Sequence, residues 1–155
     1  MTEAATYELT ISRVFDAPRE VVYQAFVNPD QLAQWFGPVG FVVPRDTVAV
    51  DARVGGHQRF VMVSADDPSV RSPVDATFTE VVENELLVGV QRAEGIPGFD
   101  GIATMTLRLE FHDEPDGKTR LELRQGPFTQ QLHAGSREGW SSSFTKLDAL
   151  LAARP

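Results

Sequence analysis

The sequence predicts a single α+β domain in which an antiparallel sheet packs one face against a long C-terminal helix. Three observations support this class. Apolar and polar residues alternate over most of residues 47–125, as in strands with one buried face. Two proline-marked helix starts precede this region, and an apolar stripe at helical spacing closes the chain. One-sided alternation favours an antiparallel sheet, and the final helix then covers its apolar face.

Residues 6–15, TYELTISRVF, form the first predicted strand, because the apolar residues Tyr7, Leu9, Ile11 and Phe15 fall on one face. Arg13 interrupts that face, and two interpretations follow. It either reaches solvent or a carboxylate at the strand end, or it is an inward charge that orients a polar ligand.

Two short helices are predicted next. Asp16 is a candidate N-cap for the first, with Pro18 in its first turn, and Asn28-Pro29 repeats this signal for the second. Gly37-Pro38 ends the second helix. Apolar residues at helical spacing follow each start: Val21, Val22, Ala25 and Phe26, then Leu32, Trp35 and Phe36.

Six further strands are predicted, at residues 47–54, 57–64, 74–82, 86–92, 102–111 and 118–125. Gly55-Gly56 is expected to make a tight hairpin turn between the first two. In residues 47–54 the alternation turns four apolar residues inward: Val48, Val50, Ala52 and Val54. The final helix is expected to begin near Ser136 and to present Trp140, Phe144, Leu147 and Leu151 on one face.

Composition limits the function classes. The chain has 155 residues, which suits one domain over residues 1–155. A net charge of −8 argues against nucleic-acid binding, which needs clustered Lys and Arg. With no cysteine, disulfides, thiolate nucleophiles and Cys-based metal sites are excluded. No apolar run has the length of a membrane span, and no signal peptide is recognisable, so the expected location is the cytoplasm.

Three segments carry a resemblance to a known family: RVFDAPREVVYQAFVNPDQLAQWFGP at 13–38, VGGHQRFVM at 54–62 and GWSSSFTKLDALL at 139–151. Their order and spacing resemble the helix-grip superfamily (Bet v 1-like, START-like, also called SRPBCC), and within it the activator of Hsp90 ATPase homologue-like family. The resemblance implies a curved sheet wrapped on the C-terminal helix, with an apolar cavity between them. Relatives often carry Arg and an aromatic residue after the paired glycines, whereas His57-Gln58 stand here.

Eight apolar residues are the candidates for lining this cavity, although each also suits ordinary core packing: Trp35, Phe36, Phe60, Met62, Phe78, Met105, Trp140 and Phe144. The resemblance places Trp35-Phe36 near the cavity mouth, either in the core or as a gate for a ligand. Polar candidates that would orient a ligand are Tyr23, His57 and Arg59, followed by Gln91 and Arg92.

No catalytic motif is evident. The serines at 141–143 have no nucleophile elbow around them, and His57, His112 and His133 lack metal-ligand spacing. We therefore expect a protein that binds a small hydrophobic molecule such as a lipid or polyketide, with no cofactor and no metal. The alternative is a cyclase or dehydratase in which Tyr23, His57 or Arg59 does acid–base work.

The resemblance also raises a chaperone-related role. The eukaryotic activator has an additional N-terminal domain that the resemblance does not cover here, so direct Hsp90 contact is not expected. A stress-response role through another protein contact stays open. A homodimer through an edge strand or through residues 93–101 also stays open.

Overall fold

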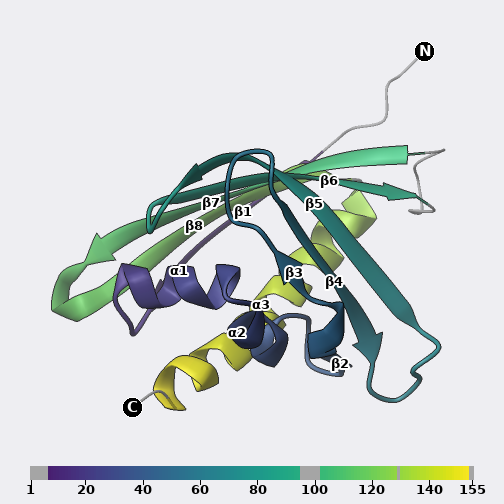
Figure 1. The fold of residues 1–155 in the computed structure, drawn as a ribbon, viewed down its shortest axis with the longest axis horizontal. Helices are drawn as coiled ribbons and strands as arrows, with labels where there is room; N and C mark the ends of the chain where they lie inside the picture. The colour runs from purple at the N-terminus through teal and green to yellow at the C-terminus, as the bar shows by residue number, and fades with distance from the viewer. Residues whose placement is uncertain (1–6, 95–101, 129, 154–155) are drawn as a thin grey trace.

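The computed structural model describes residues 7–94, 102–128 and 130–153, and it describes side chains for residues 8–91, 104–127 and 135–153. A strongly curved sheet wraps around one long helix, and two short helices close one end (Figure 1). The elements are β1 Tyr7–Phe15, α1 Arg19–Val27, α2 Pro29–Trp35, β2 Phe41–Val42, η1 Arg45–Thr47, β3 Ala49–Val50, β4 His57–Ser64, β5 Arg71–Val82, β6 Leu86–Glu94, β7 Ile102–Glu114, η2 Pro115–Gly117, β8 Lys118–Phe128 and α3 Gln130–Ala153.

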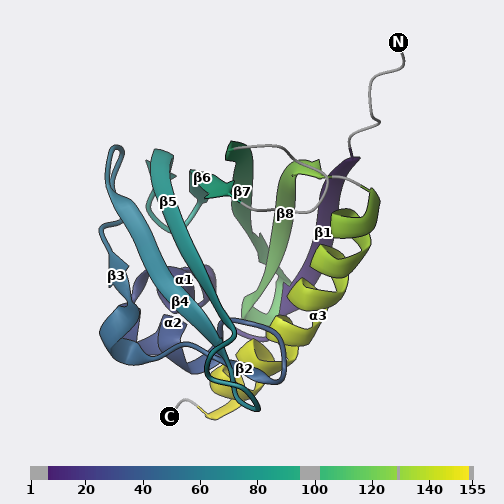
Figure 2. The same cartoon turned by 90° about the vertical axis from the view of Figure 1, so that its right-hand side faces the viewer.

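The sheet has the strand order β1-β8-β7-β6-β5-β4-β2, and β3 pairs with β4 beside this path. Every pair is antiparallel. Seen from the side in Figure 2, α3 runs along β1 and β8 inside the curve of the sheet, and α1 and α2 lie below. The α+β class, the antiparallel sheet and the layer made by the final helix are confirmed.

The two helix starts differ from one another. The Asn28 side chain caps α2 by accepting hydrogen bonds from the backbone N–H groups of Asp30 (2.9 Å) and Gln31 (3.3 Å). The prediction for Asp16 was wrong, because Pro18 occupies the N-cap position of α1 and no side chain caps that helix. Pro18 holds the extended backbone that leads into the first turn. Because its side chain has no atom that accepts a hydrogen bond, α1 starts without a side-chain cap.

Residues 47–54 were wrongly predicted as one strand, since only Ala49–Val50 pair with β4. The expected tight turn at Gly55-Gly56 is instead a longer loop over residues 51–56. This loop packs on β5, because the Gly55 N–H donates to Phe78 O and the Phe78 N–H donates to Gly56 O (both 2.9 Å). Val54, predicted to face inward, is 66% exposed in this loop.

The C-terminal helix starts six residues before the predicted position, at Gln130 rather than near Ser136. The predicted face is correct, since all four of its apolar residues are buried: Trp140, Phe144, Leu147 and Leu151. They pack on an aromatic core in which rings meet edge to face, as Phe15 and Phe144 do at 5.2 Å and Phe26 and Trp35 at 4.9 Å.

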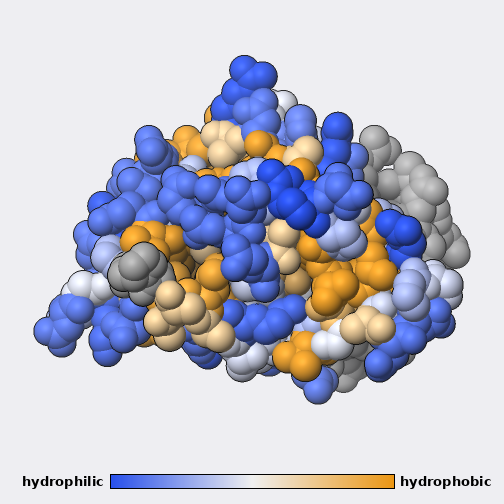
Figure 3. Space-filling view, turned by 60° about the horizontal axis from the view of Figure 1, so that its bottom comes forward, coloured by the Kyte–Doolittle hydropathy of each residue, from blue (hydrophilic) through white to orange (hydrophobic). Residues whose placement is uncertain are grey.

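The outer surface is mixed rather than broadly apolar. Figure 3 shows apolar patches separated by hydrophilic side chains on the face it presents. The exposed large apolar side chains of the described residues are all valines: Val14, Val39, Val42, Val54, Val70 and Val82. Within the described ranges, none of the helices has the length and hydropathy of a membrane span.

Candidate functional site

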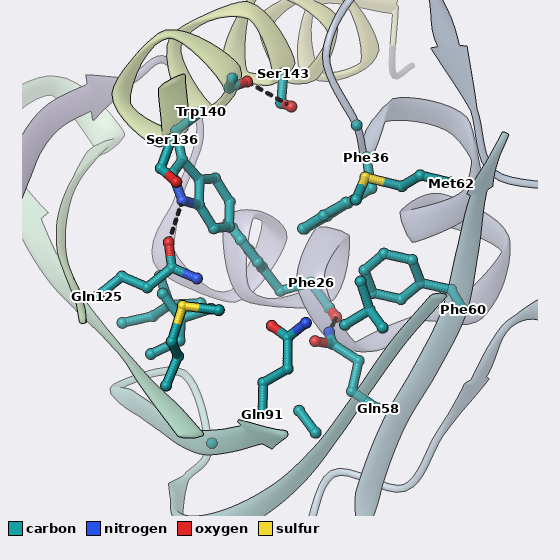
Figure 4. A pocket seen from close by; sticks show the side chains of 18 of the residues that line it. Phe26, Phe36, Gln58, Phe60, Met62, Gln91, Gln125, Ser136, Trp140 and Ser143 are labelled. Carbon is teal, nitrogen blue, oxygen red and sulfur yellow. Dashed lines mark hydrogen bonds between the residues drawn. The ribbon is translucent and has the colours of Figure 1, made fainter. Parts of the chain in front are cut away.

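A cavity of about 220 Å³ lies between the concave face of the sheet and α3 (Figure 4). Its lining is mainly apolar: Phe26, Phe36, Phe60, Met62, Val74, Phe78, Leu87, Met105, Leu107, Leu109 and Trp140. Six polar side chains interrupt this lining: Gln58, Ser72, Gln91, Gln125, Ser136 and Ser143. None of these described lining residues carries an ionisable side chain.

Strand register builds the floor of the cavity. Gln58 on β4 lies opposite Ala76 on β5, Ala76 lies opposite Gln91 on β6, and Gln91 lies opposite Met105 on β7. These four residues form one row across the concave face. Because neighbouring strands are about 4.8 Å apart, the small Ala76 leaves room between the two longer glutamines. Gln125 on β8 lies opposite Leu107, which is the next residue after Met105 on β7 that faces inward.

Two of the glutamine carboxamides are oriented by the protein. The Gln58 Nε2 donates to the backbone carbonyl of Phe26 (3.2 Å), and the Gln125 Oε1 accepts from the indole Nε1 of Trp140 (2.8 Å). Gln91 makes no side-chain hydrogen bond to another described residue. Figure 4 shows all three carboxamides reaching into the cavity from different strands.

Residues 36–41 follow α2 and are tied to α3 beside the cavity. The Val39 N–H donates to Ser142 Oγ at 2.7 Å. Lys146 Nζ donates to the carbonyls of Phe41 (3.1 Å) and Phe36 (3.5 Å), and its partial burial lowers the pKa of this amine. Phe36 and the Gly37-Pro38 pair line the cavity, so this segment forms part of its wall.

Six of the eight predicted apolar residues line the cavity: Phe36, Phe60, Met62, Phe78, Met105 and Trp140. The two others belong to the core. Trp35 is fully buried and donates its Nε1 hydrogen to Ala25 O at 2.8 Å, which directs the indole between α1 and α2. Phe144 is fully buried between Phe15 and Trp35.

The three predicted polar residues lie outside the cavity lining. Tyr23 packs edge to face on Phe111 (5.5 Å), and burial, followed by the charge of Glu83, raises the pKa of its phenol. Arg59 is exposed and pairs with Asp75 at 3.2 Å. His57 and Arg59 flank Gln58 on β4, so strand alternation turns them away from the face that Gln58 occupies.

The other residues considered from the sequence lie partly at the cavity and partly away from it. Arg13 pairs with Asp148 at 2.6 Å, so its partner is a carboxylate and not a cavity ligand. Of the serines at 141–143, Ser143 lines the cavity and donates to Gly139 O at 2.9 Å. Gln91 lines the cavity as predicted, whereas the side chains of Arg92 and His133 lie outside the described residues.

Sequence reasoning missed Gln58 and Gln125, although a signal was present. Each continues an inward-facing alternation: Gln58 precedes Phe60 and Met62, and Gln125 follows Leu121 and Leu123. A polar residue in phase with a buried face is a candidate for contacting a cavity.

The described residues offer no metal centre, since no three His, Asp or Glu side chains among them are grouped to hold an ion. What the described lining provides is shape, apolar contact and neutral hydrogen-bonding groups. Such a site can enclose and orient a molecule.

The comparison with protein families identifies one family. The family model described as Activator of Hsp90 ATPase homolog 1-like protein matches residues 16–152. No curated protein matches the sequence.

Solved structures resemble the whole fold. The AHSA1 protein of Silicibacter pomeroyi is 27% identical with a TM-score of 0.78, covering 94% of this chain and 98% of its own. A protein from Chromobacterium violaceum is 27% identical with a TM-score of 0.80, covering 92% and 95%. A protein from Mycobacterium smegmatis is 25% identical with a TM-score of 0.76, covering 97% and 98%. These neighbours share the Bet v 1-like fold, which confirms the predicted helix grip.

Proposed function

This chain belongs to the Activator of Hsp90 ATPase homolog 1-like family of the SRPBCC superfamily, and we propose that it is a binding protein whose cavity encloses one small, mainly apolar molecule. The observation that carries this proposal is the cavity itself, which stays open although aromatic residues surround it. Its volume of about 220 Å³ lies below the roughly 300–1,000 Å³ typical of sites for drug-sized ligands. We therefore expect a compact ligand of one or two rings.

The alternative hypothesis, a cyclase or dehydratase, has less support. General acid–base catalysis needs an ionisable group within hydrogen-bond reach of the substrate. The three residues proposed for that work, Tyr23, His57 and Arg59, are not among the residues that line the cavity. The raised pKa of the Tyr23 phenol also makes its ionised form harder to reach.

The family name is the only observation that suggests activation of the Hsp90 ATPase. The features that carry our proposal, the cavity and its lining, bear on a small molecule rather than on a protein surface. We therefore expect no stimulation of an Hsp90 ATPase when the two purified proteins are mixed, and a steady-state ATPase assay checks this.

Filling the cavity tests the binding proposal. Ala76→Leu adds three carbons in the space between Gln58 and Gln91, whereas Thr77→Leu places the same side chain at an exposed position of the same strand. The melting temperature is measured with and without naphthalene and a set of neutral one- and two-ring compounds. A ligand at a hundredfold excess over its Kd stabilises the folded state by about 2.7 kcal/mol.

We expect the wild type and Thr77→Leu to be stabilised by the same compounds and Ala76→Leu to show no shift while remaining folded. A wild type that none of the compounds stabilises would contradict the proposal. Equal shifts in wild type and Ala76→Leu would do so as well, because the ligand would then bind elsewhere.

A further inference from the structure

The three glutamines of the cavity are unusual for a site that accepts only hydrocarbons. Gln58, Gln91 and Gln125 come from three different strands, and each occupies an inward-facing position. A buried carboxamide that loses its water without gaining a partner is costly. An entirely apolar ligand would displace water from these carboxamides without forming hydrogen bonds to them.

The existing hydrogen bonds use part of the hydrogen-bonding capacity of two carboxamides. The Gln58 Nε2 donates one hydrogen to Phe26 O, which leaves its Oε1 to accept and its second N–H to donate. The Gln125 Oε1 accepts from the Trp140 indole, which leaves both N–H hydrogens of its Nε2 to donate, with no acceptor among the described residues. Such partners fix the orientation of an amide group.

Gln91 adds further hydrogen-bond donors and an acceptor to those of Gln58 and Gln125. It sits between Ala76 and Met105 in the row across the sheet and carries one acceptor and two donor hydrogens. Its side chain makes no hydrogen bond to another described residue, and Figure 4 shows its carboxamide beside that of Gln58. The floor of the cavity thus offers acceptors and donors side by side.

Charge is the feature missing from the described lining. The lining residues include no Asp, Glu, His, Lys or Arg, so a charged ligand would have no counter-charge among them. Moving an unpaired ion out of water into an apolar site is strongly unfavourable.

We infer that the ligand of this cavity is an uncharged compound of one or two rings that carries both a hydrogen-bond donor and an acceptor, as a lactam does, and that the carboxamides of Gln58, Gln91 and Gln125 recognise it. This inference rests on the proposed binding function and names the chemical class of its ligand.

Three probes built on the same two-ring frame separate the possibilities: the lactam quinolin-2(1H)-one, the hydrocarbon naphthalene and the anion 2-naphthoate. Isothermal titration calorimetry gives their affinities, and the indole N–H signal of Trp140 in an NMR spectrum reports binding inside the cavity. We expect the lactam to bind at least about tenfold more tightly than naphthalene, since a site built for hydrogen bonds rejects an analogue that lacks them. The anion should bind more weakly still.

Gln91→Met keeps the length of the side chain and removes its carboxamide, and Thr106→Met places the same side chain at an exposed position of β7 as a control. Gln91→Met should reduce the preference for the lactam over naphthalene by about tenfold, and Thr106→Met should leave it unchanged. Melting curves of both variants establish that they are folded.

The results distinguish this inference from the proposal beneath it. Naphthalene binding as tightly as the lactam, or the anion binding most tightly, would overturn the inference and leave the binding function standing. An unchanged lactam preference in folded Gln91→Met would also overturn it. Binding of none of the three probes would overturn both.

Discussion

Trp35 and Phe36 are neighbours in the chain with different surroundings. The Trp35 side chain is fully buried, and its Nε1–H is the donor that satisfies the buried carbonyl of Ala25. The Phe36 ring packs on the Trp35 ring, with 5.0 Å between centroids, and also lies 4.6 Å from the Phe60 ring and 5.4 Å from the Trp140 ring on the cavity wall. The first residue therefore acts on stability, and the second on the shape of the cavity.

Substitutions at these two positions should separate the two roles. Trp35→Phe should lower the free energy of unfolding by about 1–3 kcal/mol, because the Ala25 carbonyl would be left buried without a donor. Phe36→Leu should cost less than about 1.5 kcal/mol and should change the affinity for naphthalene. Urea unfolding and calorimetry measure the two effects. A larger loss of stability in Phe36→Leu than in Trp35→Phe would contradict this assignment.

Tyr23 gives the protein a pH dependence in the alkaline range. Burial and the nearby charge of Glu83 raise the pKa of its phenol above the ordinary value near 10. When the pH rises above 10, the unfolded chain loses this proton while the folded protein keeps it. The unfolded state then binds fewer protons, so the free energy of unfolding falls with pH up to the raised pKa.

The comparison of wild type with Tyr23→Phe isolates this contribution. Between pH 9 and pH 11 the free energy of unfolding should fall more steeply in the wild type than in Tyr23→Phe, which has no phenol at this position. Urea unfolding at closely spaced pH values measures both slopes, and groups common to the two proteins cancel in their difference. Parallel slopes would show that Tyr23 does not titrate abnormally.

At the scale of single elements, the starts of α1 and α2 provide a matched pair. Asn28 caps α2 through two backbone N–H groups, whereas Asp16 is exposed and does not cap α1. Asn28→Ala should lower the free energy of unfolding by about 1 kcal/mol. Asp16→Ala should change it by less than about 0.5 kcal/mol, as expected of a surface position. Equal losses in the two variants would refute the assignment of the cap.

The elements also show how far sequence patterns reach. Alternation correctly placed the buried face of β7, with Leu109 and Phe111 inward, because each strand residue points opposite to the one before it. The same alternation failed in residues 47–54, because the paired strand ends at Val50 and the loop at residues 51–56, which joins β3 to β4, also bonds to β5. A hydrogen bond to a strand more than twenty residues away leaves no local trace in the sequence.

The cavity shows the same limit. The family resemblance, together with helical and strand periodicity, predicted eight apolar residues around it, and six of these eight line it. It did not predict that Trp35 would turn to the core, since that depends on the position of the Ala25 carbonyl in the folded helix pair. The row of Gln58 and Gln91 depends on the register of three strands, and register is a property of pairing rather than of any one segment.

At the scale of the whole molecule, the segment after α2 is joined to the C-terminal helix beside the cavity. Val39 N–H bonds to Ser142 Oγ, and Lys146 Nζ bonds to Phe41 O and Phe36 O. These contacts bring together parts of the chain about a hundred residues apart. A ligand that enters beside Phe36 has to pass the segment that they hold.

Ser142→Ala tests this connection directly. The substitution removes the acceptor of the Val39 N–H, so the amide of Val39 should exchange with solvent about an order of magnitude faster, as expected when one modest hydrogen bond is lost. Ser141→Ala, at the neighbouring exposed position, should leave exchange at Val39 unchanged. Hydrogen exchange followed by NMR measures both variants. If the segment limits ligand passage, the same Ser142→Ala variant should release naphthalene faster than the wild type, whereas an unchanged release rate would place the entrance elsewhere on the molecule.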